Sequence, residues 1–179
     1  MEFDRQKFKA LVLYIIWKAG DVPGFGLTKI NKVLWFSDAR TFEAYGRPVT
    51  GETYIRRQFG PVPKHIDEVL DELVAEGDVR AWSEPYFEFE VKRYKAHSPP
   101  ETLIFSPDEL GFIDWWIKHI AEEHTAASIS EKSHDYGWTL AREGEELPLR
   151  TFLAKRIREP KAGDELDWAR RTAEELESK

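Results

Sequence analysis

The apolar positions near the N-terminus recur at helical spacing and predict two helices. In residues 8–19 they repeat at intervals of three and four, and Gly20 follows as the expected C-terminal cap. Residues 28–45 are apolar or aromatic over more than half of the helical circumference, with Thr28 as the expected N-cap and Gly46 beyond the end. We therefore expect this second helix to be buried on two sides and to be the most buried element.

The rest of the second helix forms a narrow polar stripe that contains one aromatic residue. The stripe consists of Lys29, Lys32, Phe36, Arg40 and Glu43. Aromatic residues and arginines are enriched where proteins bind one another, so Phe36, Arg40 and Glu43 form a candidate partner-binding face. Two other interpretations of Phe36 stay open: a single exposed aromatic residue, which is common on soluble proteins, or burial beneath the C-terminal segment.

Beyond Gly46 the chain predicts short strands and further helices. We expect a strand at residues 53–59, a rigid corner at Gly60-Pro61-Val62-Pro63, a helix at 63–76 and hairpin strands at 79–82 and 87–91. Ser106 followed by Pro107 and Glu109 is a strong helix-start signal. It predicts a helix that ends near residue 123, and a short helix is expected at 126–133.

The whole pattern predicts a predominantly helical α+β fold. About five to seven helices surround the long buried second helix, together with a small antiparallel β-sheet or hairpin. We assign residues 1–158 to one domain and residues 159–179 to a charged, helical C-terminal tail. The boundary is placed there because beyond Pro160 the residues are mostly charged or small, with only a thin apolar stripe.

Composition narrows the compartment and the chemistry. The chain has 179 residues, 41% of them hydrophobic, and no cysteine, so it can bury a core but has no disulfide or thiolate chemistry. Its longest apolar run, residues 10–17, is too short to span a bilayer, and the first residues lack the pattern of a secretory signal. We expect a cytoplasmic protein that is not inserted in a membrane.

The order of the predicted elements also resembles a winged helix, in which the third helix would enter a DNA groove. Charge argues against that use, because the formal net charge is −7 and DNA phosphates repel carboxylates. The exposed face of the third helix carries Asp67, Glu68, Asp71, Glu72 and Glu76. Nucleic acid is therefore not an expected partner, and a winged-helix transcriptional regulator is kept as the alternative function.

Asp38 is the most unusual ionisable residue, because it lies between Trp35 and Phe42 in the aromatic sector of the second helix. One interpretation is a catalytic or partner-binding carboxylate. The other is a structural carboxylate that accepts hydrogen bonds from backbone amides or from Tyr54. We favour the structural interpretation, since the sequence ties no second carboxylate or nucleophile to Asp38.

Neither nucleophilic chemistry nor a metal site is indicated by the remaining polar residues. Ser133 and His134 are adjacent, but members of a catalytic triad converge from distant parts of a chain. His119, Glu123 and His124 lack the spacing of two metal-binding histidines on one helical face. We predict no enzymatic activity, no cofactor and no metal.

Three motifs of this chain, in the same order, resemble the Panacea domain of SocA-like antitoxins, which also occurs in phage-associated proteins. They are residues 27–38 (LTKINKVLWFSD), residues 45–51 (YGRPVTG) and residues 60–63 (GPVP). Ser133 and His134, followed by Trp138 and Gly144, resemble a later signature of the family. The resemblance covers about residues 5–150; Trp35 departs from it mildly, and the segment beyond Pro160 has no counterpart.

The resemblance implies a bacterial or phage antitoxin that neutralises a cognate protein toxin by direct contact. It also implies a second route, in which the protein is an adaptor that delivers the toxin to a protease. The family pairs with many unrelated toxins and brings no catalytic residues to transfer. Together with the patterns above, it leads us to expect that Phe36, Arg40 and Glu43 contribute to the toxin face. The residues expected to hold the fold are Asp38, Tyr54, Gly60, Pro61, His134 and Trp138.

Overall fold

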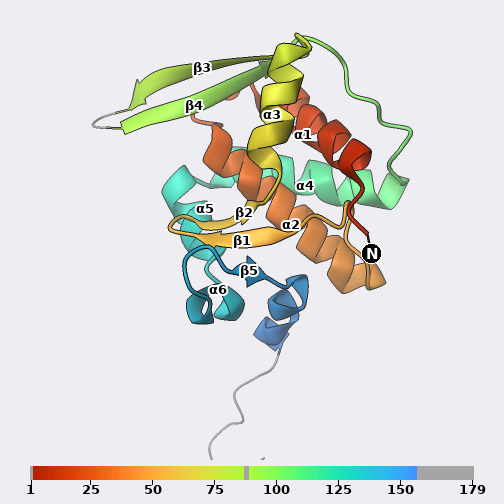
Figure 1. The fold of residues 1–179 in the computed structure, drawn as a ribbon, viewed down its shortest axis with the longest axis vertical. Helices are drawn as coiled ribbons and strands as arrows, with labels where there is room; N and C mark the ends of the chain where they lie inside the picture. The colour runs from red at the N-terminus through yellow and green to blue at the C-terminus, as the bar shows by residue number, and fades with distance from the viewer. Residues whose placement is uncertain (1, 87–88, 157–179) are drawn as a thin grey trace, which may run out of the picture.

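The fold comes from a computed structural model that describes residues 2–86 and 89–156 (Figure 1). The predicted tail at residues 159–179 lies outside the described residues. Its separation from a domain at residues 1–158 therefore stays a proposal.

Within the described residues, six α-helices alternate with short antiparallel strands, which confirms the predominantly helical α+β fold. The elements are α1 (Arg5–Ala19), α2 (Leu27–Tyr45), β1 (Tyr54–Arg57), β2 (Gly60–Pro63), α3 (Ile66–Ala75), β3 (Val79–Tyr86), β4 (Phe89–Ala96), α4 (Pro107–Glu123), α5 (Ala126–Lys132), α6 (Tyr136–Leu140), β5 (Glu146–Leu147) and the 3-10 helix η1 (Leu149–Arg156). Helix α2 lies at the centre, with α1, α4, α5, β2 and η1 packed around it (Figure 1).

Of the two caps predicted for α2, only the C-terminal cap is confirmed. At the C-terminus, Gly46 adopts φ 70° and its amide donates to the carbonyl of Phe42, as a capping glycine does. At the N-terminus, the cap is Gly26, which makes no side-chain capping bond, so the prediction of Thr28 as N-cap was wrong. Thr28 lies inside the helix, because the helix begins at Leu27, before the hydroxyl that was expected to cap it.

The predicted corner at residues 60–63 is instead a strand. β2 pairs antiparallel with β1, so that Tyr54 lies opposite Pro63 and Arg57 opposite Gly60. A two-residue turn at 58–59 reverses the chain, and β2 forms the edge of a sheet in the order β2-β1-β5. An edge strand tolerates proline, because a residue without an N–H can face away from the ladder.

The β3–β4 hairpin is longer than predicted, since β3 continues through residues that were expected to form the turn and β4 continues past residue 91 to Ala96. Pro85, expected in that turn, lies opposite Glu90. It is tolerated there because both strands of a two-stranded ribbon are edges.

Helix α4 begins with the capping box that the sequence predicts. The hydroxyl of Ser106 accepts from the amide of Glu109 at 3.3 Å, and the carboxylate of Glu109 accepts from the amide of Ser106 at 2.8 Å. The same buried carboxylate accepts from Lys7 Nζ of α1 at 2.8 Å. One side chain therefore caps α4 and joins it to α1.

Gly60 is the position where the sheet comes closest to α2. Its φ is 98°, and an added Cβ would overlap Ser133 Oγ and lie 2.6 Å from Lys32 Nζ. We expect Gly60→Ala to lower the free energy of unfolding by more than about 2 kcal/mol, because backbone strain adds to a steric clash. Urea denaturation measures this loss.

Gly77→Ala is the matched control. Gly77 has a similar φ of 83°, but nothing lies within 4 Å of an added Cβ. It should cost only the backbone strain, about 1 kcal/mol. If both variants lost the same free energy of unfolding, the close approach of Gly60 to Lys32 and Ser133 would not contribute to stability.

Candidate functional site

Asp38 is fully buried and accepts four hydrogen bonds. Its Oδ1 accepts from the amides of Val49 at 2.8 Å and Thr50 at 3.2 Å. Its Oδ2 accepts from the hydroxyls of Tyr54 at 2.8 Å and Thr50 at 3.2 Å. These are the bonds expected for a structural carboxylate, and they join α2 to the loop before β1 and to β1 itself.

The surroundings of Asp38 suit a structural role. Burial raises the pKa of Asp38 to about 6, while the hydrogen bonds from Tyr54 and from residues 49–50 oppose the rise. Burial also raises the pKa of Tyr54, and the neighbouring Asp38 adds to the effect. His134, the other residue considered for catalysis, stacks on Trp138.

Lys32 was expected on the exposed polar stripe, but it is 1% exposed. The prediction was wrong because β2 and the segment after α5 cover this side of α2, where Lys32 Nζ and Ser133 Oγ both lie against Gly60. Lys32 Nζ donates to the carbonyl of Pro61 at 3.1 Å. Burial lowers the pKa of Lys32 to about 7. Lys29, placed on the same stripe, is also buried.

Three side chains stack near Lys32. The ring of His134 lies 3.6 Å from that of Trp138 with an angle of 7° between the planes, and the guanidinium of Arg56 lies 4.3 Å from the same indole. The indole N–H of Trp138 donates to the carbonyl of Arg57 at 3.0 Å. Burial, and then the nearby charges of Lys32 and Arg56, lower the pKa of His134.

The adjacent Ser133 and His134 do not form a nucleophile and base in this arrangement. The hydroxyl of Ser133 donates to the carbonyl of Ser130 at 2.6 Å, so it is used at the end of α5. His134 packs face to face on Trp138 instead. The stack joins α6 and His134 to β1, and the Lys32 contact joins β2 to α2.

Phe36, a candidate for the partner-binding face, is 1% exposed. Its ring stacks on Trp116 of α4 at 4.4 Å and meets Phe152 of η1 edge-on at 6.4 Å. The ring packs against α4 and η1, so the polar stripe is covered at Phe36. Of the interpretations left open for Phe36, burial beneath the C-terminal segment agrees with its contact with Phe152 of η1.

Arg40 is the member of the stripe that remains accessible. Its side chain is 44% exposed, and that of its ion-pair partner Glu43 is 13% exposed. The guanidinium lies 5.4 Å from the ring centroid of Phe112 on α4. Arg40 therefore lies on the side of α2 that faces α4.

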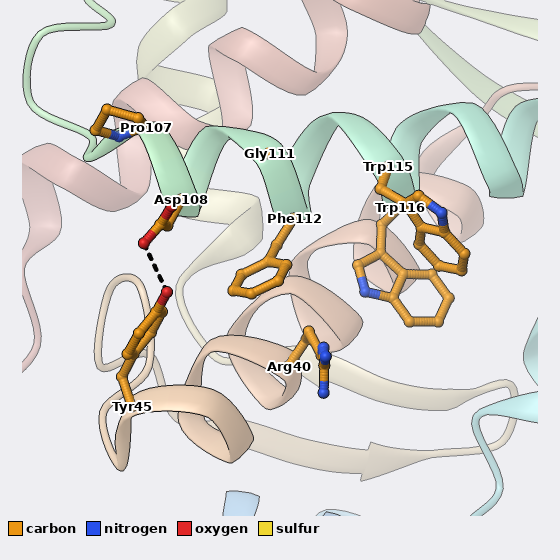
Figure 2. A pocket seen from close by; sticks show the side chains of 8 residues that line it. All are labelled: Arg40, Tyr45, Pro107, Asp108, Gly111, Phe112, Trp115 and Trp116. Atoms are coloured by element: carbon orange, nitrogen blue, oxygen red, sulfur yellow. Dashed lines mark hydrogen bonds between the residues drawn. The ribbon is translucent and has the colours of Figure 1, made fainter.

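A groove of about 600 Å³ opens between α2 and α4 at this point (Figure 2). Its lining residues are Arg40, Tyr45, Pro107, Asp108, Gly111, Phe112, Trp115 and Trp116. The Tyr45 hydroxyl donates to Asp108 at 2.6 Å and closes one end, as Figure 2 shows. Trp115 is 55% exposed and Tyr45 is 50% exposed, so large aromatic faces are open to a partner.

Gly111 leaves space in the groove that any other residue would fill. Nothing lies within 4 Å of a Cβ added there. A glycine inside a helix costs about 1 kcal/mol relative to alanine, so folding alone does not favour it. Figure 2 shows that Gly111 lies on α4 between Asp108 and Trp115.

Sequence reasoning missed the α4 side of this groove. Phe112 and Trp115 lie three residues apart on a helix whose inward face contains Ile113, Trp116 and Ile117. Two aromatic residues outside the apolar face were the available signal. The sequence did not indicate that these two residues would lie beside α2.

The structure also brings His119 and His124 together. Their Nε2 atoms are 3.4 Å apart, and Lys132 Nζ lies 3.1 Å from that of His119. The helical spacing rule did not apply, because α4 ends at Glu123 and His124 is its extended C-cap. Burial, and then Lys132 and His119, lower the pKa of His124. Among residues 2–86 and 89–156, no group of three or more His, Cys, Asp or Glu side chains is arranged to hold a metal ion.

Comparison with known proteins decides the family. A family model described as antitoxin SocA-like, Panacea domain matches residues 30–139, more than half of the chain. The chain belongs to this family. Comparisons with curated proteins and with solved structures found no match. No helix in the described part of the chain is long and apolar enough to cross a membrane.

The matched segment of the Panacea domain contains both kinds of site described above. It includes the Asp38 network and the Lys32 contact, and it reaches Trp138 in the aromatic stack. It also includes every residue that lines the α2–α4 groove. Helix α1 and the η1 segment that packs on Phe36 lie outside it.

The buried Lys32 should make the stability of the Panacea domain depend on pH. Because its pKa is about 7 in the fold, against 10.5 for an unperturbed lysine, the unfolded chain binds more protons between these values. Stability from this group therefore rises with pH over that range, by up to about 1 kcal/mol per pH unit. Lys32→Met should remove this rise, as urea denaturation between about pH 7.5 and 9.5 would show.

Lys64→Met is the control for that experiment, since the side chain of Lys64 is 52% exposed. It should leave the pH dependence of the wild-type protein in place. If the Lys32→Met and wild-type stabilities ran parallel over the range, the buried amine would not be titrating as proposed.

Proposed function

We propose that the protein is an antitoxin that neutralises a cognate protein toxin by direct contact through the α2–α4 groove. Membership of the SocA-like antitoxin family supports the role. The single observation that supports this location of the toxin face is the exposure of Trp115 and Tyr45 beside Arg40, on two helices that pack in the core. Tryptophan, tyrosine and arginine are the residues most enriched at binding hot spots.

The groove replaces Phe36 as the anchor of the proposed toxin face and keeps Arg40. Phe36 contributes indirectly, because its stack on Trp116 sets the separation of α2 and α4. Asp108 and Arg40 supply opposite charges at the rim, so a partner is positioned by polar contacts around an aromatic centre. Glu43 acts through its ion pair with Arg40.

Direct neutralisation and delivery to a protease share the binding step and differ in the fate of the bound toxin. An inhibitor blocks the purified toxin in the absence of any protease and leaves the toxin's lifetime unchanged. An adaptor shortens that lifetime in cells. We favour the inhibitor, because a groove on rigid helices is sufficient for stoichiometric binding.

The alternative of a DNA-binding regulator receives no support from α3. Asp67, Glu68 and Asp71 are exposed on this helix. Glu72 forms ion pairs with Arg5 and Lys9 of α1, so the nearby basic residues are used within the protein. A phosphate backbone approaching α3 would meet carboxylates.

Trp115→Ala is the direct test of the groove. With the product of the neighbouring gene as the candidate toxin, we expect binding to weaken at least about 30-fold, as at hot spots worth about 2 kcal/mol or more. Isothermal titration calorimetry measures the affinity, and rescue of growth on co-expression measures neutralisation. Trp17→Ala is the matched control, because Trp17 is 48% exposed on α1, away from the groove.

Gly111→Trp tests the same groove by filling it without removing a contact. We expect toxin affinity to fall at least about tenfold while the melting temperature changes little, since the added side chain enters open space. Gly111→Ala should retain binding. If Trp115→Ala, Gly111→Trp and Trp17→Ala all bound the toxin as the wild type does, the groove would not be the toxin face.

A further inference from the structure

The two histidines at the end of α4 present their Nε2 atoms to each other. His119 lies in the last turns of α4, and His124 follows its final residue in an extended conformation. The two rings meet edge to face, with centroids 5.0 Å apart and Nε2 atoms 3.4 Å apart. Two Zn–N bonds of about 2.05 Å at a tetrahedral angle place their nitrogens about 3.3 Å apart, so the spacing fits two ligands of one ion.

The other ring nitrogens are held by oxygen atoms. Nδ1 of His119 lies 3.1 Å from a carboxylate oxygen of Glu123, which accepts the N–H. Nδ1 of His124 lies 3.1 Å from Ser128 Oγ, whose own hydroxyl donates to the carbonyl of Thr125 at 3.3 Å. In the neutral tautomers that donate from Nδ1 to these oxygens, both Nε2 atoms carry a lone pair. Histidines that ligate metals are oriented in this way by carboxylate or other oxygen partners.

A positive group already lies beside both of these nitrogens. Lys132 Nζ is 3.1 Å from Nε2 of His119 and 3.5 Å from Nε2 of His124, so the ammonium lies within hydrogen-bond reach of both. Two neighbouring lone pairs attract a cation, and the ammonium of Lys132, at the end of α5, is the cation that lies beside them. A divalent ion that displaced it would find both ligands in place.

We propose that His119 and His124 form a binding site for a late first-row divalent cation such as Zn²⁺, on the side of the pair where the Lys132 ammonium lies. Imidazole is a preferred ligand of zinc, copper and nickel. The chain's described residues supply two ligands, so the remaining positions of the ion are open to water or to a side chain of another molecule. This site is independent of the proposed toxin contact.

The surroundings shelter the two ligands without closing the site. The side chain of His119 is 15% exposed, and its ring stacks on Trp115 at 4.6 Å. Glu123 is 64% exposed beside it and adds negative charge that favours a cation. Because His119 is shielded while its partner Glu123 is exposed, an ion could reach the site from the surface.

Titration of the full chain with ZnCl₂ at about pH 7.5 in a non-coordinating buffer tests the site by isothermal titration calorimetry. We expect one ion per chain, and at least a tenfold loss of affinity in His119→Gln and in His124→Gln. Lys132→Met should raise the affinity at least severalfold, because the competing ammonium is gone. His97→Gln, just beyond the end of β4, is the matched control and should bind as the wild type does.

Nitrogen NMR of the histidine rings gives a second readout that does not depend on the variants. Zn²⁺ should shift the Nε2 resonances of His119 and His124 much more than their Nδ1 resonances, which should keep their protons. A larger shift at Nδ1 than at Nε2 would overturn the proposal. So would equal Zn²⁺ affinity in the wild type and in a folded His119→Gln, His124→Gln double variant, or an unchanged affinity in Lys132→Met.

Discussion

Burial of α2 on nearly all sides is the constraint on which the rest of the structure depends. A buried charged side chain on a helix in this position needs a partner inside the protein, because an unpaired buried charge is costly. Asp38 finds four donors in the loop before β1 and in Tyr54, and Lys32 finds the carbonyl of Pro61. The small sheet is thus held to the helix by polar contacts as well as by apolar packing, and its strands can be short.

The same helix separates the structural contacts from the accessible surface. On one side, β2, α5 and α6 close over Lys32 through Gly60, Ser133 and the Arg56–Trp138–His134 stack. On the other side, α4 contacts α2 through Trp116 on Phe36 and through Asp108 on Tyr45, and the groove lies along α4 between these two contacts. The motifs that resemble the family lie mainly in the first set.

Helix α4 combines three tasks because its faces meet different surroundings. Its inward face packs in the core, its first turn is capped by Glu109, and its outer face supplies Phe112 and Trp115 to the groove. Its C-terminal end places His119 against Trp115 and against His124. The proposed cation site and the proposed toxin face therefore share a neighbour, although each stands on its own contacts.

The sequence by itself determined the order and type of most helices, the glycine cap of α2, the capping box of α4 and the acceptor role of Asp38. These features depend on residues near one another along the chain or on the strong demand of a buried carboxylate. Tertiary structure decided that Lys32 and Phe36 are buried, that residues 60–63 form a strand, and that His119 meets His124. A helical wheel shows which side chains share a face, but it does not show which other elements will cover that face. That depends on the packing of α4, β2 and η1 around α2, segments that are distant in the chain and meet only when the core forms.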